Sequence, residues 1–535
     1  MSATTIARDV VVRLLSMGVT DVVVAPGSRS GPLARALVAA DGQQLIRLHV
    51  RVDEREAAFL ALGMAKVSRR ATPVVTTSGT AAANLHPAML EALHAHVPLV
   101  AITADRPGRL RGTGANQTTI QPGIFPGIGT VADIDDIDVA VSTPQHLNLE
   151  LDEPLTEPVA WDFPTDAVLE PSDADPPPAT RLEPGPRTVV VAGDAQSRWS
   201  GPQARLLAAE ADWPLFAEPS SGARTGSALT SYRLLLSHRA LADRIERVVS
   251  FGHPTLSRAV TSLLSRDVEI VHVGDQRSFP VPVGANVTFV EAVEYAGGTR
   301  ETDDAGWLAD WQKADAAVTG AVAALADAWP AAEPLRVARD VWEAVTPNGL
   351  LVVGSSNPIR DLDLIGRPFA PGQKRKVIAN RGLAGIDGVV STAVGAALAR
   401  PSSRALAFMG DLTFLHGSNG LMMGATEPRP DLTIVIANDD GGGIFSVLEQ
   451  GAPEFADSFE RVFGTPVGAN LAQLSASFGV SHERVSPGNV AEALATPRSG
   501  VHVLEVPIPR DSRRELSDRL TAIAAEVLSD LGMTG

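Results

Sequence analysis

Short apolar runs alternate with patterns of helical type in the first third of the chain. The apolar runs lie at 21–25, 45–50, 73–77 and 98–104. The helical patterns between them lie at 32–40, 54–67 and 81–94. Short strands that alternate with helices predict parallel βαβ units, and strands built mainly from Val, Ile and Leu are buried on both faces. This part is therefore predicted to be an α/β layer.

The same alternation of predicted strands and helices occurs twice more along the chain. A second series of predicted strands lies at 188–194, 247–252 and 268–273. A third lies at 349–353, 376–379, 405–409, 432–437 and 502–506. Proline-rich, acidic sequence at 154–186 has the composition of a linker. We predict three α/β domains with parallel sheets flanked by helices, at 1–165, 187–330 and 335–535.

Composition narrows the class of protein. The chain has 535 residues, 44% of them hydrophobic, and no uninterrupted apolar stretch of about 18 residues, so we expect a globular protein without a membrane span. The absence of cysteine and of a basic-then-apolar amino-terminal segment favours a cytoplasmic location. A net charge of −17 disfavours general nucleic-acid binding, because a phosphate backbone demands a basic surface.

Two predicted strand ends carry hard oxygen ligands. Met409-Gly410-Asp411-Leu412 closes one strand, and Asn438-Asp439-Asp440-Gly441 closes another 27 residues later. That distance accommodates a helix and a return strand, so both ends meet at one edge of a parallel sheet. A Gly-Asp pair alone is more often a turn. The two together predict a Mg²⁺ or Ca²⁺ site that holds a diphosphate.

Other motifs leave alternatives open. Pro26-Gly27-Ser28-Arg29 follows a strand and precedes a helix, which suits either an anion site or a helix cap with an exposed arginine. Residues 76–80 repeat that geometry, but neither segment matches a phosphate-binding P-loop. Glu54 lies at a strand-to-helix junction, where acidic residues often only favour the helix dipole. The chain also lacks the metal motif His-Glu-x-x-His and a plausible Gly-x-Ser-x-Gly elbow.

Together these motifs resemble the thiamine diphosphate enzymes over nearly the whole chain. Within that family the chain is most similar to the branch of menaquinone biosynthesis that joins 2-oxoglutarate to isochorismate. The resemblance rests on the segments 25–30, 53–55, 76–80, 103–107, 115–117, 380–388 and 410–412. It implies a pyrimidine-binding domain, a central domain and a diphosphate-binding domain, in that order.

The resemblance implies a catalytic and cofactor-binding set. Glu54 matches the glutamate that activates the cofactor. Asp411, Asp439 and the Gly441 carbonyl match the ligands of Mg²⁺, with Mn²⁺ as an alternative ion and Asn438 as a rival ligand. The residues implied to contact thiamine diphosphate are Pro26, Thr77, Asn84, Gln117, Ile386, Gly410, Asp411, Leu412, Asn438 and Ile444.

It also implies binding sites for two dicarboxylates, 2-oxoglutarate and isochorismate. Arginine suits this task because its guanidinium binds carboxylates bidentately, although a surface ion pair is an alternative for each arginine. The implied substrate residues are Ser28, Arg29, Arg106, Asn116, Gln117, Arg258, Ser356, Arg360, Arg381, Phe445 and Leu448. The family further implies a homo-oligomer, a dimer or a dimer of dimers, with active sites shared between subunits.

Two other functions remain open. The main enzymatic alternative is another thiamine diphosphate enzyme, such as a 2-oxoacid decarboxylase or an acetolactate-synthase-like protein. Against them, the arginine set exceeds what a small neutral acceptor needs, and the middle domain lacks a Gly-x-Gly-x-x-Gly fingerprint. A non-catalytic ligand sensor is the second alternative, and the retention of Glu54 argues against it.

Overall fold

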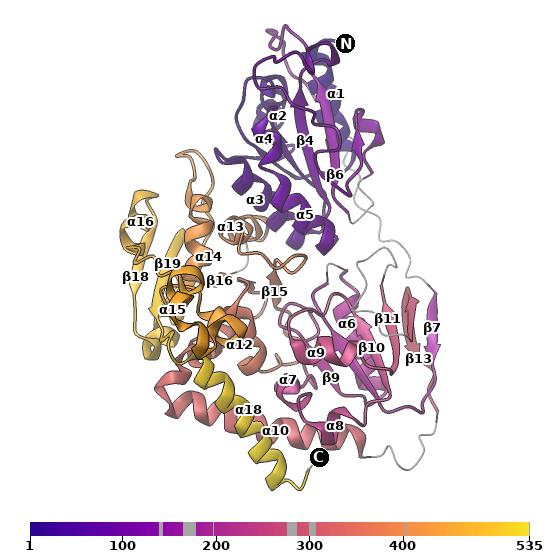
Figure 1. Cartoon of the computed structure of the whole chain (residues 1–535). Coiled ribbons are helices and arrows are strands. Elements are labelled where there is room, and N and C mark those ends of the chain that lie inside the picture. The colour runs from indigo at the N-terminus through magenta and orange to yellow at the C-terminus, as the bar shows by residue number, and fades with distance from the viewer. Residues whose placement is uncertain are drawn as a thin grey trace.

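Three α/β lobes make up the molecule (Figure 1). The computed structural model describes residues 1–138, 143–163, 178–195, 197–274, 286–298, 306–401 and 404–533. The first lobe lies at the top of Figure 1, the second at the lower right, and the third on the left. The predicted fold class, parallel sheets flanked by helices, is confirmed. Part of the predicted linker and the predicted limit at 165 lie outside the described residues.

The first lobe contains a six-stranded parallel sheet in the order β2-β1-β3-β4-β6-β5. Its strands are β1 (Asp21–Val24), β2 (Arg47–Val50), β3 (Thr72–Thr76), β4 (Leu99–Asp105), β5 (Thr130–Val131) and β6 (Gln145–Glu150). Its helices are α1 (Ala3–Ser16), α2 (Gly31–Gly42), α3 (Glu54–Ser68), α4 (Thr80–Ala83) and α5 (His86–Ala95). The single helix expected at 81–94 is wrong, since it is divided into α4 and α5. Pro87 in the first turn of α5 has no N–H to continue a helix through that point.

The second lobe holds a five-stranded parallel sheet in the order β12-β11-β10-β8-β9 and a separate pair, β13-β7. Its strands are β7 (Ala179–Leu182), β8 (Thr188–Ala192), β9 (Leu215–Ala217), β10 (Arg247–Phe251), β11 (Glu269–Val273), β12 (Val287–Val290) and β13 (Ala292–Tyr295). Its helices are α6 (Ser200–Glu210), α7 (Tyr232–Leu235), α8 (Arg239–Ala242) and α9 (Arg258–Leu264).

The third lobe contains a second six-stranded parallel sheet, in the order β15-β14-β16-β17-β19-β18. Its strands are β14 (Leu350–Val353), β15 (Lys376–Ala379), β16 (Ala405–Gly410), β17 (Leu432–Asn438), β18 (Ser481–Arg484) and β19 (Val501–Pro507). The helices of this part are α10 (Trp307–Ala328), α11 (Glu333–Glu343), α12 (Asn357–Ile365), α13 (Val389–Ala399), α14 (Asp411–His416), α15 (Ala456–Phe459), α16 (Leu471–Ser477), α17 (Val490–Ala495) and α18 (Arg513–Asp530).

The first and third lobes meet through α3 and α13, which lie side by side (Figure 1). A methyl group added at Gly63 of α3 would lie 2.1 Å from the Thr392 carbonyl oxygen of α13. One added at Gly395 of α13 would lie 2.1 Å from the Leu60 carbonyl oxygen of α3. Glycine at both positions therefore lets the two backbones touch, and one apolar core continues from the first sheet into the third.

The second and third lobes also share a core. Trp311 of α10 packs against Phe216 of the second lobe, with ring centroids 4.9 Å apart. The same helix packs against α18 in the third lobe. Helix α10 thus belongs to the packing of both lobes, although its residues precede the expected limit at 330.

Candidate active site

Two aspartates follow neighbouring strand ends of the third sheet. β16 and β17 pair with Gly410 opposite Ala437, so Asp411 and Asp439 reach the same edge. Their carboxyl groups hydrogen-bond to each other. Burial, followed by repulsion from Asp411, raises the pKa of Asp439 to about 7, and burial also raises the pKa of Asp411. Two buried carboxyl groups this close disfavour ionisation of both, and a cation bound between them would offset that cost.

The neighbouring asparagine has a different environment. The Asn438 side-chain amide donates to Glu505 Oε1 at 2.9 Å, and Asn438 Oδ1 accepts from the Asp440 backbone N–H at 3.0 Å. Both ends of the Asn438 amide are therefore engaged, one with Glu505 of β19 and one with the Asp440 backbone, whereas Asp439 hydrogen-bonds to Asp411.

The acidic edge suits a hard cation. Asp411 Oδ1 is buried and has no hydrogen-bond partner among the described residues. The described residues contain no cluster of three or more His, Cys, Asp or Glu side chains arranged for a metal. Two carboxylates with backbone carbonyls nearby suit an ion that completes its shell with phosphate oxygens and water, as Mg²⁺ does.

Glu54 begins α3 at the carboxyl edge of the first sheet. The helix is capped by Asp53, whose Oδ1 accepts from the Arg55 and Glu56 backbone N–H groups at 3.0 and 3.2 Å. Glu54 Oε2 accepts from the Asn84 side-chain amide at 3.2 Å. The structure thus brings together a predicted catalytic residue and a predicted cofactor contact.

Loops after β1 and β3 lie at that same edge. The two strands pair with Val24 opposite Val75, so Pro26 and Thr77 follow neighbouring strand ends. Pro26 is exposed and Thr77 is buried.

Two predicted arginines lie together in the first lobe. Arg106 Nη1 donates to Ser78 Oγ at 2.8 Å and to the Gln117 carbonyl oxygen at 2.7 Å. Arg29 Nη1 donates to the Leu151 carbonyl oxygen at 2.9 Å. Burial, followed by the charge of Arg29, lowers the pKa of Arg106. The predicted contacts Ser28, Asn116 and Gln117 are exposed polar side chains on the adjacent loops.

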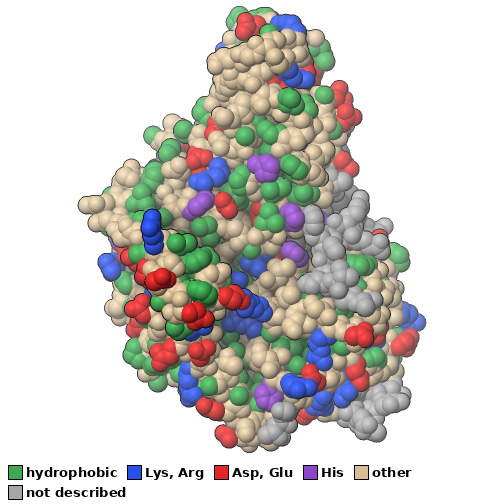
Figure 2. Space-filling model, in the orientation of Figure 1, with side chains coloured by type: hydrophobic (Ala, Val, Ile, Leu, Met, Phe, Trp, Pro, Cys, Tyr) green, Lys and Arg blue, Asp and Glu red, His purple; other side chains and the backbone are tan. Residues whose placement is uncertain are grey.

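A second arginine group joins the second and third lobes. Arg360 Nη1 donates to the Ser356 carbonyl oxygen at 2.7 Å, and Arg381 Nη2 donates to Thr255 Oγ1 at 3.2 Å. Burial, then the charges of Arg381 and Arg233, lower the pKa of Arg360 to about 10. Figure 2 shows Lys and Arg side chains around a hollow near the middle of the drawn face, where the lobes meet.

The predicted substrate arginines differ among themselves in their partners, and Arg29 Nη2 lies 3.8 Å from Glu153 Oε1. Within the described part of the chain, the guanidinium groups of Arg106, Arg360 and Arg381 form no salt bridge with a carboxylate, although the Arg106 backbone N–H donates to Asp105 Oδ1 at 2.7 Å. Arg258 instead pairs with Glu449 at 3.5 Å, and both side chains are more than 70% exposed. Arg258 is therefore placed in a surface ion pair, which was one of its two expected roles.

The predicted apolar contacts occupy the third lobe. They are all half-buried: Leu412, Ile386, Ile444, Phe445 and Leu448. Leu412 lies in the first turn of α14, and Phe445 packs against Phe463 with ring centroids 5.7 Å apart.

Comparison with known proteins agrees with this architecture. Residues 4–124 match the N-terminal TPP binding domain of thiamine pyrophosphate enzymes, and residues 365–506 match their C-terminal TPP binding domain. A Nocardioides 2-succinyl-5-enolpyruvyl-6-hydroxy-3-cyclohexene-1-carboxylate (SEPHCHC) synthase is 52% identical over 98% of both chains. The enzyme of the same name from Kineococcus radiotolerans is 44% identical over 97% of this chain and 98% of its own. The chain belongs to this synthase family. The family resemblance found in the sequence is confirmed, and thiamine diphosphate is the cofactor.

Several residues beside the family's site were missed from the sequence. Arg513, in the first turn of α18, binds Asp361 through two 2.8 Å hydrogen bonds, and its charge lowers the pKa of Asp439. Arg233 of α7 lies near Arg360 in the second arginine group. No motif marks either arginine, because each reaches the site from an element distant in sequence.

Glu56 is a further buried carboxyl group that the sequence did not single out. Ser391 Oγ donates to Glu56 Oε2 at 2.5 Å, joining α3 to α13. Burial raises the pKa of Glu56 to about 7. Its place three residues after the cap Asp53 is a weak signal, since that position often serves only the helix terminus.

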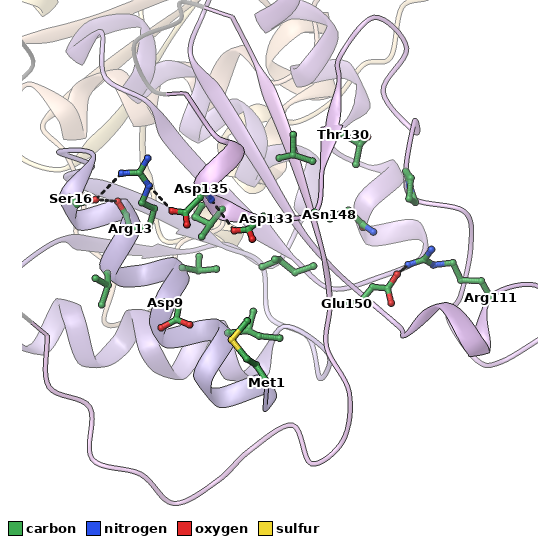
Figure 3. Close-up of a pocket in the computed structure, with 18 residues that line it drawn as sticks. Met1, Asp9, Arg13, Ser16, Arg111, Thr130, Asp133, Asp135, Asn148 and Glu150 are labelled. Atoms are coloured by element: carbon green, nitrogen blue, oxygen red, sulfur yellow. Dashed lines mark hydrogen bonds and ion pairs between the residues drawn. The ribbon is translucent and has the colours of Figure 1, made fainter.

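A cavity of about 720 Å³ lies elsewhere in the first lobe (Figure 3). It is lined by α1 and by residues around β5 and β6, including Asp133 and Glu150. Arg13 pairs with Asp135 at 3.2 Å on its wall, and Arg111 pairs with Glu150. None of the predicted site residues lines it. No helix in the described part of the chain has the length and apolar character to cross a membrane.

Proposed function

We propose that this chain catalyses the thiamine diphosphate-dependent decarboxylation of 2-oxoglutarate and the addition of the remaining four-carbon unit to isochorismate, with SEPHCHC and carbon dioxide as products. The one-carbon fragment leaves as carbon dioxide, and a new carbon–carbon bond joins the other four carbons to the isochorismate ring. The identity to SEPHCHC synthases supports this reaction.

The observation that carries the proposal is the state of the arginines. Arg106, Arg360 and Arg381 are held by protein oxygens but have no carboxylate partner in the described residues. An acidic protein that leaves guanidinium groups unpaired concentrates positive charge locally, which suits dicarboxylate substrates. We assign Arg29 and Arg106 to isochorismate, and Arg360 and Arg381 mainly to 2-oxoglutarate.

The acidic edge supports a place for Mg²⁺ and the diphosphate. Asp411, Asp439 and the Gly441 carbonyl would hold the ion, and Asn438 would secure the loop. The unpartnered Asp411 Oδ1 supports this ligand set, as does the engagement of the Asn438 amide with Glu505. Mn²⁺ has similar ligand preferences and is an alternative ion.

The remaining chemistry belongs to Glu54 and its surroundings. When bound, thiamine diphosphate supplies the electron sink that stabilises a carbanion. Glu54 would hold a proton at the aminopyrimidine ring, and Asn84 orients the Glu54 carboxyl group by a 3.2 Å hydrogen bond. The half-buried side chains of Ile386, Ile444, Phe445 and Leu448 would limit water at the reacting centre.

We also propose a homodimer, or a dimer of dimers, whose active sites are shared between subunits. Large apolar side chains beside the site are exposed in the single chain: Val52 by 65%, Ile120 by 75% and Leu383 by 51%. Each lies within three residues of a predicted site residue. Large exposed apolar side chains near a site favour coverage by another protein surface, here a second copy of the chain.

An assay of carbon dioxide release tests the proposed reaction. The purified chain, supplied with thiamine diphosphate and Mg²⁺, should release carbon dioxide from 2-oxoglutarate, form SEPHCHC by mass spectrometry, and do both fastest with isochorismate present. Efficient turnover of pyruvate in place of 2-oxoglutarate would favour an acetolactate-synthase-like enzyme. Cofactor binding without turnover of any 2-oxoacid would favour a sensor.

A further inference from the structure

A carboxylate of the first lobe holds a loop of the third lobe. Glu91 lies on α5, and its two carboxylate oxygens accept from two consecutive backbone N–H groups. Oε1 accepts from Gly382 at 2.8 Å, and Oε2 accepts from Leu383 at 2.7 Å. Glu91 is only 4% exposed, so this contact is shielded from water. Both acceptor atoms of Glu91 are therefore committed to the loop that follows β15.

Lys66 of α3 binds the last residue of β15, just before the same loop. Its Nζ donates to the Ala379 carbonyl oxygen at 2.8 Å and lies 3.9 Å from Glu91 Oε1. The Lys66 side chain is fully buried. Burial raises the pKa of Glu91, whereas Lys66 and the two backbone N–H groups lower it. A buried charge pair of this kind is intolerant of the loss of either member or of the backbone groups it binds.

Gly382 fixes the distance between the loop and α5. A methyl group added at Gly382 would lie 2.5 Å from the Glu91 carbonyl oxygen and 2.9 Å from the Ala95 backbone nitrogen. The loop therefore rests directly on the helix backbone. A shift of α5 is transmitted to the loop through this backbone contact and through the two hydrogen bonds of the Glu91 carboxylate.

Arg381 lies between these contacts. Its backbone is flanked by Ala379 and Gly382, which the first lobe holds, and its guanidinium donates to Thr255 of the second lobe. Arg381 is 3% exposed, and its charge acts on the neighbouring Arg360. All three lobes thus determine where this guanidinium lies.

We infer that Glu91, assisted by Lys66, is a positioning residue that sets the location of the Arg381 guanidinium for carboxylate binding. Glu91 and Lys66 make their contacts with the loop backbone, and they act on substrate only through Arg381. The inference rests on the proposed function, in which Arg381 binds 2-oxoglutarate. Misplacement of a binding group by about 1 Å can reduce activity by about 100-fold, so the hold is functionally significant.

The substitution Glu91→Gln tests the hold. A carboxamide has one acceptor oxygen, so its NH₂ group would face one of the two loop N–H donors. We expect the KM for 2-oxoglutarate to rise about 10-fold or more, while the KM for isochorismate stays within about twofold. Hydrogen exchange at Gly382 and Leu383 should become faster, and this readout requires no turnover.

Matched variants separate positioning from general destabilisation. Asp21→Asn changes another buried carboxylate of the first lobe, which binds His49 and Arg47 at 3.0 and 2.7 Å. It should lower Tm and leave both KM values unchanged. Lys66→Met provides a second route if Glu91→Gln fails to fold. It should also raise the KM for 2-oxoglutarate, by a smaller factor than Glu91→Gln does.

A double-mutant cycle gives the sharpest result. If Glu91 acts through Arg381, Glu91→Gln should raise the KM for 2-oxoglutarate in the wild-type background and have little further effect in Arg381→Ala. Multiplying effects in the double variant, equal changes in both KM values, or unchanged loop exchange would overturn the inference. A wild-type chain that does not decarboxylate 2-oxoglutarate would instead overturn the proposed function, and the exchange measurement would still decide whether Glu91 holds the loop.

Discussion

The first and third sheets have the same topology and different chemistry at their carboxyl edges. Both contain six parallel strands, and numbering the strands of each sheet in chain order gives the order 2-1-3-4-6-5 in both. In the third sheet the edge carries Asp411 and Asp439, which share a hydrogen bond. In the first sheet it carries Glu54, which accepts from Asn84, together with the hydroxyl of Thr77.

The difference shows how one scaffold serves two tasks. Strand order determines which loops meet at an edge, whereas the residues on those loops determine what the edge binds. The paired carboxylates of the third sheet suit a cation and its diphosphate. Glu54, which begins α3 at the edge of the first sheet, suits proton transfer. We therefore expect substitutions at the two edges to separate cofactor binding from turnover.

The largest effect is expected for Glu54→Gln. The variant should retain thiamine diphosphate and lose turnover by about 100- to 10,000-fold, because a positioned acid/base group is removed while the cation site is intact. Isothermal titration with the cofactor and steady-state rates would measure the two properties. Wild-type turnover in this variant would refute the role of Glu54.

Asp411→Asn and Asp439→Asn should have the opposite profile. Loss of a direct metal ligand should weaken Mg²⁺ binding by more than the roughly 10- to 100-fold that is typical of outer-shell partners. The rise in Tm on adding Mg²⁺ and thiamine diphosphate should disappear.

Asp440→Asn is the matched control in the same loop. Asp440 is exposed, and its Oδ1 accepts from the Gly468 backbone N–H at 2.9 Å, a bond that asparagine can keep. This variant should retain the rise in Tm. Equal losses in all three variants would mean that loop charge, rather than ligation by Asp411 and Asp439, supports the ion.

The two arginine groups should show an intermediate effect that is selective for substrate. Alanine at Arg29 or Arg106 should raise the KM for isochorismate, and alanine at Arg360 or Arg381 should raise the KM for 2-oxoglutarate. A charged hydrogen bond contributes about 1.5–3 kcal/mol, which corresponds to about 10- to 100-fold in each KM.

The exposed Arg239, paired with Asp243 at 2.9 Å, provides a control for loss of positive charge. Arg239→Ala should leave both KM values unchanged. Unchanged KM values in all four site variants would count heavily against dicarboxylate binding by these residues.

The smallest effect concerns a histidine that recurs in both sheets. His146 is the second residue of β6, and His502 is the second residue of β19. Burial lowers the pKa of each to about 4. The unfolded chain, with a histidine pKa near 6.5, then binds more protons between about pH 4 and 6.5. Stability should therefore be complete above about pH 6.5 and fall as the pH falls through that window.

Urea unfolding at pH 7 and pH 5 would measure this dependence. His146→Gln should reduce the loss of stability between pH 7 and pH 5 by up to about 2 kcal/mol, with a similar direction for His502→Gln. A loss that is identical in the wild type and both variants would show that other groups govern acid unfolding.

Local patterns predicted four of the six strands in the first sheet, five of the six in the third and the two strand-end motifs, but they missed β5, β6 and β18. Strand β15 was predicted at its observed limits, and α3 began at Glu54 as expected. These elements were readable because apolar runs, glycine and helix caps are local signals. The break between α4 and α5 was missed, although Pro87 could have indicated it.

The contacts that join the lobes could not be predicted in this way. No sequence motif marks Glu91, which lies on a predicted helix. Its role depends on two backbone N–H groups almost 300 residues later in the chain. Arg513 likewise depends on Asp361 in another helix. The roles of such residues depend on tertiary packing. The spacing of residues in a single sequence does not reveal that packing.

Mixed dimers provide the most direct test of the central claim, that the first sheet supplies proton transfer and the third sheet binds the cation and diphosphate. Co-expression of Glu54→Gln with Asp411→Asn should give dimers in which one shared site carries both lesions and the other carries neither. If the Glu54 edge of one chain works with the Asp411 edge of its partner, purified mixed dimers should recover about half of the wild-type activity per dimer. Mixed dimers no more active than either parent would contradict two independently acting shared sites.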